Sequence, residues 1–161
     1  MFPRDGKRDG FSEWPLIPAK RRADGGHQVP VAVLLANAPR PNGQGSVLLD
    51  LDDVTTLFHE FAHVLHELVG QGDYALFSGT NVEPDFAEAP SVMMESFVTD
   101  GHVLKEIARD PADPTKPFPM DVVAQLKKSH AYSSRLEDKR QLALAKINMA
   151  VHTNGEGRRR S

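Results

Sequence analysis

The chain has 161 residues, of which 40% are hydrophobic and 25% are charged, a composition typical of one soluble globular domain with a hydrophobic core. Nineteen Lys and Arg residues against 22 Asp and Glu residues give a net charge of −3, which argues against broad electrostatic binding of nucleic acid or anionic membranes. Cysteine is absent, so disulfides, thiolate metal sites and cysteine nucleophiles are excluded. Histidine and carboxylate side chains remain as ligands for a transition metal.

The sequence gives no sign of a membrane span or a targeting peptide. No apolar run approaches the ~20 residues that a transmembrane helix needs. Residues 1–6 carry charges where a secretory signal peptide has its apolar segment. We therefore expect a cytoplasmic protein without a membrane partner.

The N-terminal quarter of the chain predicts loops and one strand. Residues 1–28 combine Gly, Pro and charged residues without periodicity, so we expect a loop-rich lead-in with a turn at Asp24-Gly25-Gly26. The apolar and β-branched run over 28–38 predicts a strand, and Pro30 places it at a strand start or on a sheet edge. Residues 39–45 predict an exposed loop, because they are rich in Pro, Gly and Asn.

The next segment has the strongest helical pattern of the chain. Apolar residues recur at helical spacing up to Gly70, and Asp52 or Asp53 is the expected N-cap of this helix. The recurring residues are Val54, Leu57, Phe58, Phe61, Leu65 and Leu68.

The rest of the sequence predicts further helices joined by loops. A loop is expected over 71–84 and a Pro-rich connector over 110–119, and Pro90 is expected in the first turn of a helix or at a kink. The expected helices cover 85 to about 98, 102–109, 121–131 and 134–152. Residues 154–161 are expected to be disordered. The predicted fold class is mainly α, with about five helices and a small β element.

The central motif of the first predicted helix is His59-Glu60-Phe61-Ala62-His63, an H-E-x-x-H sequence. Residues four apart return to the same face of an α-helix one turn later, so the imidazoles of His59 and His63 can bind one metal ion together. Zinc suits two neutral imidazoles with a carboxylate. Glu60 lies about 100° further around the helix, beside the metal, where its carboxylate can accept a proton from the attacking water.

The motif is a specific signal. In a chain of this length, an H-E-x-x-H motif arises by chance with a probability on the order of one in a hundred or less.

A catalytic zinc site needs a third protein ligand. The longer pattern H-E-x-x-H-x-x-G-x-x-H is excluded, because His66 and Val69 stand where it needs Gly and His. A carboxylate from the next helix is the alternative, and position alone leaves four candidates open. They are Glu83, Asp85, Glu88 and Glu95.

Three ordered segments of the chain carry a family resemblance. They are Thr56-Leu57-Phe58-His59-Glu60-Phe61-Ala62-His63-Val64-Leu65-His66, Phe77-Ser78-Gly79-Thr80 and Asp85-Phe86-Ala87-Glu88-Ala89-Pro90-Ser91. The sequence resembles the thimet oligopeptidase family of zinc metallopeptidases, which includes neurolysin, saccharolysin and bacterial oligopeptidases. The resemblance extends over most of the chain. It implies a gluzincin-type helical catalytic core over 1–153 that hydrolyses short peptides.

The resemblance also implies roles for individual residues. It makes His59 and His63 zinc ligands, Glu60 the general base, and Glu88, the glutamate before Ala-Pro-Ser, the third ligand of one Zn²⁺ per chain. Glu95 shares a helix face with Glu88 and is a candidate to orient a ligand imidazole by accepting its second N–H, the alternative being an ordinary surface carboxylate.

Substrate contacts are expected from a strand and a loop. The strand that ends at Ala36 and Asn37 is a candidate to bind an extended peptide by strand addition, the alternative being an ordinary core strand. Gly79 is a candidate for close approach of the backbone to the substrate, and the alternative is that it permits a turn.

The chain departs from the family pattern in length and at its C-terminal end. Family members carry a large N-terminal helical domain and continue into a Gly- and Tyr-rich segment that stabilises the oxyanion, and neither Tyr74 nor Tyr132 matches that segment. We therefore expect low activity and loose specificity. The alternative is a truncated zinc-binding remnant that acts as an interaction module and self-associates through surface that the missing segments leave exposed. The net negative charge argues against nucleic-acid binding through Arg158-Arg159-Arg160.

Overall fold

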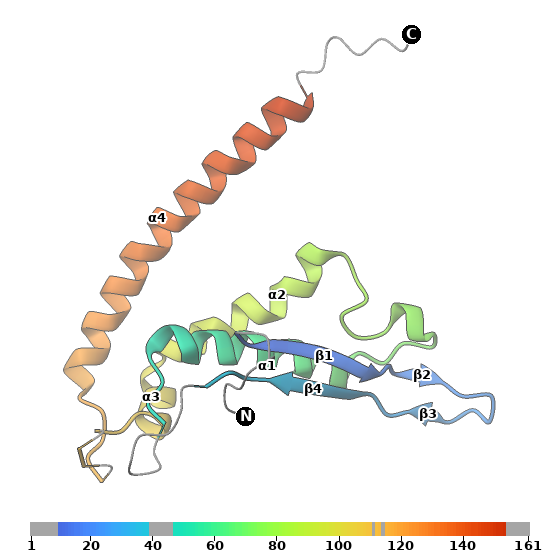
Figure 1. Cartoon of the computed structure of the whole chain (residues 1–161), viewed down its shortest axis with the longest axis horizontal. Coiled ribbons are helices and arrows are strands. Elements are labelled where there is room, and N and C mark those ends of the chain that lie inside the picture. The colour runs from blue at the N-terminus through green and yellow to red at the C-terminus, as the bar shows by residue number, and fades with distance from the viewer. Residues whose placement is uncertain (1–9, 39–46, 111, 114, 154–161) are drawn as a thin grey trace. The chain divides into compact units, whose positions relative to one another are not determined.

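The computed structural model describes residues 10–38, 47–110, 112–113 and 115–153 (Figure 1). The chain divides into two compact units, Met1–Pro117 and Phe118–Ser161. The predicted loop over 39–45 and the predicted disordered tail over 154–161 lie outside the described residues. Among the helices in the described residues, none combines the length and the apolar character needed to cross a membrane.

The strands of the first unit form two small antiparallel pairs. Strand β1 (Ser12–Ile17) pairs with β4 (Val31–Leu35), and β2 (Lys20–Arg21) pairs with β3 (His27–Gln28). The predicted strand is thus present as β4, which begins directly after Pro30. The predicted turn lies between β2 and β3, where Oδ1 of Asp24 accepts a hydrogen bond of 2.9 Å from the Gly26 N–H.

The expectation of a loop-rich lead-in over 1–28 is corrected by β1, β2 and β3. Strand β1 contains Pro15, and its register with β4 shifts between Pro15 and Ile17. Proline and an irregular register both hide a strand from sequence patterns. Strand β1 shows no local periodicity. It is stabilised by its pairing with β4, which comes later in the chain.

Helix α1 (Leu51–Val69) is the central element of the first unit. It packs against the β1–β4 pair and against α2 (Pro84–Glu95), and Figure 1 shows these elements together. The N-cap is Asp50, whose Oδ1 accepts a hydrogen bond of 2.8 Å from the Asp53 N–H. The predicted cap at Asp52 or Asp53 is therefore wrong. Both residues lie in the first turn, where negative charge is favourable near the positive end of the helix dipole.

The segments after α1 follow the prediction closely. The short 3₁₀ helix η1 (Ala75–Phe77) interrupts the predicted loop, and η2 (Ser96–Thr99) and α3 (Gly101–Ile107) follow α2. Proline at the first position of a helix costs no hydrogen bond, which explains why α2 starts at Pro84. The second proline, Pro90, lies inside α2 beyond its first turn, so the expected place in the first turn is wrong, and the helix continues through the proline.

The second unit contains one long helix, α4 (Met120–Thr153), where the sequence predicted separate helices over 121–131 and 134–152. The residues at the expected break, Tyr132 and Ser133, include neither Gly nor Pro, so nothing in the backbone forces an interruption. The described residues contain four α-helices instead of the expected five. The predicted class, mainly α with a small β element, is confirmed.

Candidate metal centre

Helix α1 presents His59 and His63 on one face. Their ring centroids lie 5.0 Å apart and the ring planes are nearly perpendicular, at 80°. The two side chains are largely shielded, with 25% and 13% of their surface exposed. This arrangement follows from the spacing of four residues within one helix.

Helix α2 brings the carboxylate of Glu88 to this pair. Its Oε2 atom lies 3.3 Å from Nε2 of His59 and 3.4 Å from Nε2 of His63. In tetrahedral zinc sites with bonds of about 2.0–2.1 Å, neighbouring ligand atoms are about 3.3–3.4 Å apart. The ligand atoms of the three residues lie within 4.8 Å of one another, so the group could hold a metal ion.

The other carboxylates that the sequence left open as third ligand differ from Glu88 in position. Glu83 and Asp85 lie exposed at the start of α2, and the group that could hold a metal includes neither of them. Glu95 lies at the end of α2, and its Oε1 is 2.6 Å from Nδ1 of His59. Because Nε2 of the same ring faces Glu88, Glu95 contacts the second ring nitrogen, as expected of a residue that orients the imidazole. This role stays a prediction.

Glu60, the predicted general base, is half-buried on α1 and lies near a carboxylate from β1. That carboxylate belongs to Glu13, whose Oε1 is buried without a hydrogen-bond partner among the described residues. Burial, together with repulsion by Glu67 and Glu60, raises the pKa of Glu13 from 4.5 to about 7. Sequence reasoning missed Glu13, because nothing in the predicted lead-in indicated that β1 would lie against α1.

Glu67 is a second buried carboxylate that sequence reasoning missed. Only 1% of it is exposed, and its Oε1 accepts hydrogen bonds from the N–H and the hydroxyl of Thr80, at 2.8 and 2.5 Å. Gly79 is buried directly against this carboxylate with φ of 59°. A signal was present, since Glu67 follows His63 by four residues on the same helix face. Binding of substrate by Gly79 stays a prediction.

The other predicted substrate contacts, Ala36 and Asn37, directly follow β4 and are half-buried. In the described part of the chain, β4 pairs only with β1, so its second edge has no strand beside it. Strand addition by a peptide at this edge stays a prediction.

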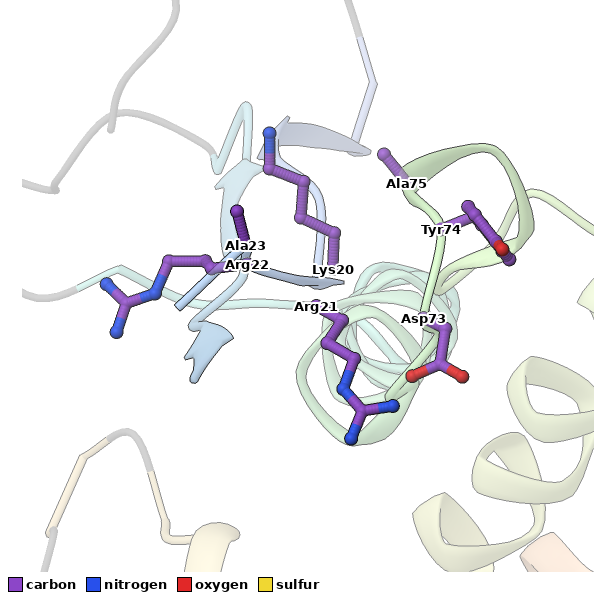
Figure 2. A pocket seen from close by; sticks show the side chains of 7 residues that line it. All are labelled: Lys20, Arg21, Arg22, Ala23, Asp73, Tyr74 and Ala75. Atoms are coloured by element: carbon purple, nitrogen blue, oxygen red, sulfur yellow. The ribbon is translucent and has the colours of Figure 1, made fainter. Parts of the chain in front are cut away.

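A separate cavity lies between the β2–β3 hairpin and the segment that follows α1 (Figure 2). Its volume is about 360 Å³. The Arg21 N–H donates a hydrogen bond of 3.0 Å to the Asp73 carbonyl and joins the two walls. None of the predicted site residues lines this cavity. Its lining residues are Lys20, Arg21, Arg22, Ala23, Asp73, Tyr74 and Ala75.

A helix with an H-E-x-x-H motif, joined by a carboxylate from the following helix, is the arrangement of a metallopeptidase centre. Comparison with known proteins agrees, since residues 1–159 match the model of peptidase family M3. The chain belongs to this family, and the resemblance predicted from the sequence is confirmed.

Individual relatives match along almost the whole chain. A thimet-like oligopeptidase of Dictyostelium discoideum is 38% identical over 95% of this chain and 23% of its own length. A probable thimet oligopeptidase of Arabidopsis thaliana is 31% identical, covering 97% of this chain and 22% of the relative. The mitochondrial intermediate peptidase of Homo sapiens is 33% identical, and the match covers 94% of this chain and 21% of the relative. The chain thus spans less than a quarter of the length of these relatives.

Proposed function

We propose that this chain is the zinc-binding catalytic part of an M3 peptidase that hydrolyses short peptides. The proposal rests on one observation: His59 Nε2, His63 Nε2 and Glu88 Oε2, from two packed helices, lie close enough together to bind one metal ion. Three protein ligands leave one position of a tetrahedral zinc site open, which is the pattern of catalytic sites. Membership of the family supports peptides as the substrate class.

In this proposal each residue near the centre has one task. His59 and His63 hold zinc through Nε2, and Glu88 holds it through Oε2. Zinc, when bound, polarises the peptide carbonyl and lowers the pKa of water. The carboxylate of Glu60 accepts a proton from the attacking water and transfers it to the leaving amine. Glu60 directly follows His59 in α1, so the base stays beside the ligand pair.

The peptide is proposed to bind in an extended conformation beside β4. Within the described residues only β1 pairs with this strand, so backbone N–H and C=O groups along its second edge can bond an added strand. Ala36 and Asn37, which directly follow β4, are proposed as further contacts of the peptide, and so is the backbone of Gly79. Because these hydrogen bonds involve only the backbone of the peptide, peptides with many different side chains could bind.

The first test is the metal content of protein purified without added metal, measured by mass spectrometry. We expect one zinc per chain, and we expect Glu88→Ala to lower the zinc content strongly. Glu83→Ala is the matched control, because Glu83 is an exposed glutamate beside α2 and lies outside the proposed ligand group. A folded wild-type sample that binds no zinc after zinc is supplied would contradict the proposal.

A second candidate function is a zinc-binding interaction module with little or no activity. Tyr74, Leu76 and Phe77, near η1, expose 71%, 72% and 70% of their surface. Large apolar side chains gathered at the surface favour association with another protein or a second copy of the chain. Sedimentation analysis tests this candidate, and a strictly monomeric species at high concentration would argue against self-association.

We propose a cytoplasmic protein without nucleic-acid or membrane partners. Several relatives carry the name mitochondrial intermediate peptidase, so imaging of the tagged chain in cells should compare the cytoplasm with mitochondria.

A further inference from the structure

Ser91 connects the interior of the first unit to the candidate metal centre. It is completely buried, with 0% of its surface exposed, whereas the Glu88 side chain is 54% exposed. The Ser91 Oγ lies 2.8 Å from Oε2 of Glu88 and 2.8 Å from the Glu88 carbonyl oxygen. A fixed hydroxyl therefore contacts a carboxylate that is otherwise largely in solvent.

The hydroxyl contacts the same carboxylate oxygen that faces the histidines. Oε2 of Glu88 lies 3.3 and 3.4 Å from the two imidazole Nε2 atoms. An ionised carboxylate can only accept hydrogen bonds, so Ser91 is the donor. Each carboxylate oxygen has two lone pairs, and the hydroxyl occupies one of them and leaves the other for a metal ion.

This contact restricts a flexible side chain. A glutamate side chain that becomes ordered loses rotamer entropy, and binding of a metal has to overcome this loss. The Ser91 hydroxyl orders the carboxylate of Glu88 before any ion arrives. Hydrogen bonds to an ionised group are also stronger than those between neutral groups, which favours Oε2 over the carbonyl oxygen as the acceptor.

We infer that Ser91 is a positioning residue of the metal centre: its hydroxyl holds Oε2 of Glu88 toward His59 and His63 and so strengthens the binding of zinc. The inference rests on the zinc site of the proposed function. Loss of a hydrogen-bond partner of a metal ligand typically weakens metal binding 10–100-fold. We expect a loss of about this size when the hydroxyl is removed.

Ser96 provides a matched control. Its Oγ donates a hydrogen bond of 2.7 Å to the Met93 carbonyl, which lies three residues earlier, as the Glu88 carbonyl does for Ser91. Ser96 is exposed and its hydroxyl has no carboxylate partner among the hydrogen bonds of the described residues. Ser96→Ala thus removes an equivalent backbone contact without touching Glu88.

The experiment measures zinc affinity by competition with a chromogenic chelator for the wild type, Ser91→Ala and Ser96→Ala. Ser91→Ala should raise the zinc dissociation constant about 10–100-fold, while Ser96→Ala should change it less than about threefold. Equal affinities for Ser91→Ala and the wild type would overturn the inference. A wild type that binds no zinc would instead refute the proposed function, so the two failures are distinguishable.

Two further variants separate positioning from a general loss of packing. In a Glu88→Ala background the added Ser91→Ala change should leave the remaining zinc affinity unaltered, because the hydroxyl has no carboxylate to hold. Ser91→Thr keeps the hydroxyl and should bind zinc more tightly than Ser91→Ala. Equal losses in Ser91→Thr and Ser91→Ala, with both variants folded by circular dichroism, would show that packing matters and would overturn the inference.

Discussion

The carboxylate of Glu67 fills the space in which a side chain at Gly79 would begin, so the two residues fit together only while position 79 is glycine. Gly79 has φ of 59°, in the left-handed region that favours glycine. Hydrogen bonds from Thr80 hold the carboxylate in place. The pair fixes the loop before α2 to the helix that carries both histidines.

Gly79→Ala should therefore destabilise the protein by about 2–4 kcal/mol, because the left-handed backbone disfavours alanine and the Glu67 carboxylate has to leave its hydrogen bonds. Urea denaturation measures the change. Gly25→Ala is the matched control, since Gly25 has φ of 83° but open space around the added atom. The control should cost only about 1–2 kcal/mol. Equal losses in the two variants would show that the contact with Glu67 contributes nothing.

Glu60→Gln should retain zinc and lose peptidase activity. The amide cannot accept the proton from water, so cleavage of a fluorogenic peptide should fall about 10²–10⁴-fold. Glu83→Gln, a change of the same kind on an exposed residue, should leave both zinc content and cleavage unchanged. Full activity of zinc-loaded Glu60→Gln would rule out the assigned general base.

Glu95→Ala should weaken zinc binding about tenfold or more. It removes the carboxylate that lies 2.6 Å from Nδ1 of His59 and that is proposed to orient the ring for metal binding. Chelator competition measures the change, and Glu106→Ala on the exposed face of α3 serves as the control. If Glu95→Ala and Glu106→Ala had the same affinity, Glu95 would be an ordinary surface carboxylate.

Glu13→Gln should stabilise the protein at neutral and alkaline pH. The pKa of Glu13 is raised from 4.5 to about 7 in the folded state, chiefly by burial and then by Glu67 and Glu60. Below pH 4.5 Glu13 is protonated in both the folded and the unfolded state, so it does not lower the free energy of unfolding. As the pH rises to about 7 the unfolded state loses its proton first, so the folded state becomes less stable.

The gain from Glu13→Gln should thus be small at about pH 5 and largest at about pH 8, where we expect on the order of 1 kcal/mol after allowance for solvent screening. Denaturation at both pH values tests this. Glu106→Gln controls for the removal of one negative charge from an exposed site. A gain from Glu13→Gln that is larger at the lower pH would contradict the assigned direction.

Local patterns predicted the part of the site that lies within one helix. The periodicity of residues 51–69 placed His59, Glu60 and His63 on an α-helix, and the structure has that helix. The third proposed metal ligand, Glu88, lies on α2, so the pattern of α1 could not identify it. Spacing left four carboxylates open, and only the family resemblance singled out Glu88, which the structure places beside the histidines.

Contacts between distant segments were not predictable in the same way. The pairing of β1 with β4 brings Glu13 toward α1, yet no local signal marks β1 as a strand. The roles assigned to Glu67 and Ser91 depend on which atoms meet after α1 and α2 pack, and a sequence pattern does not give that geometry. Helix α4 continues through the expected break because residues 132 and 133 are neither Gly nor Pro, so the change in apolar pattern there does not end the helix.

The proposed ligands come from two helices, with His59 and His63 on α1 and Glu88 on α2, in a chain that has no cysteine. A bound ion would therefore act as a reversible crosslink that closes the segment from residue 63 to residue 88, as a disulfide does in secreted domains. At a free zinc concentration of about 100 times the dissociation constant, this link adds about 2.7 kcal/mol to the free energy of unfolding. The supply of zinc in the cell would then control resistance to proteolysis as well as catalysis.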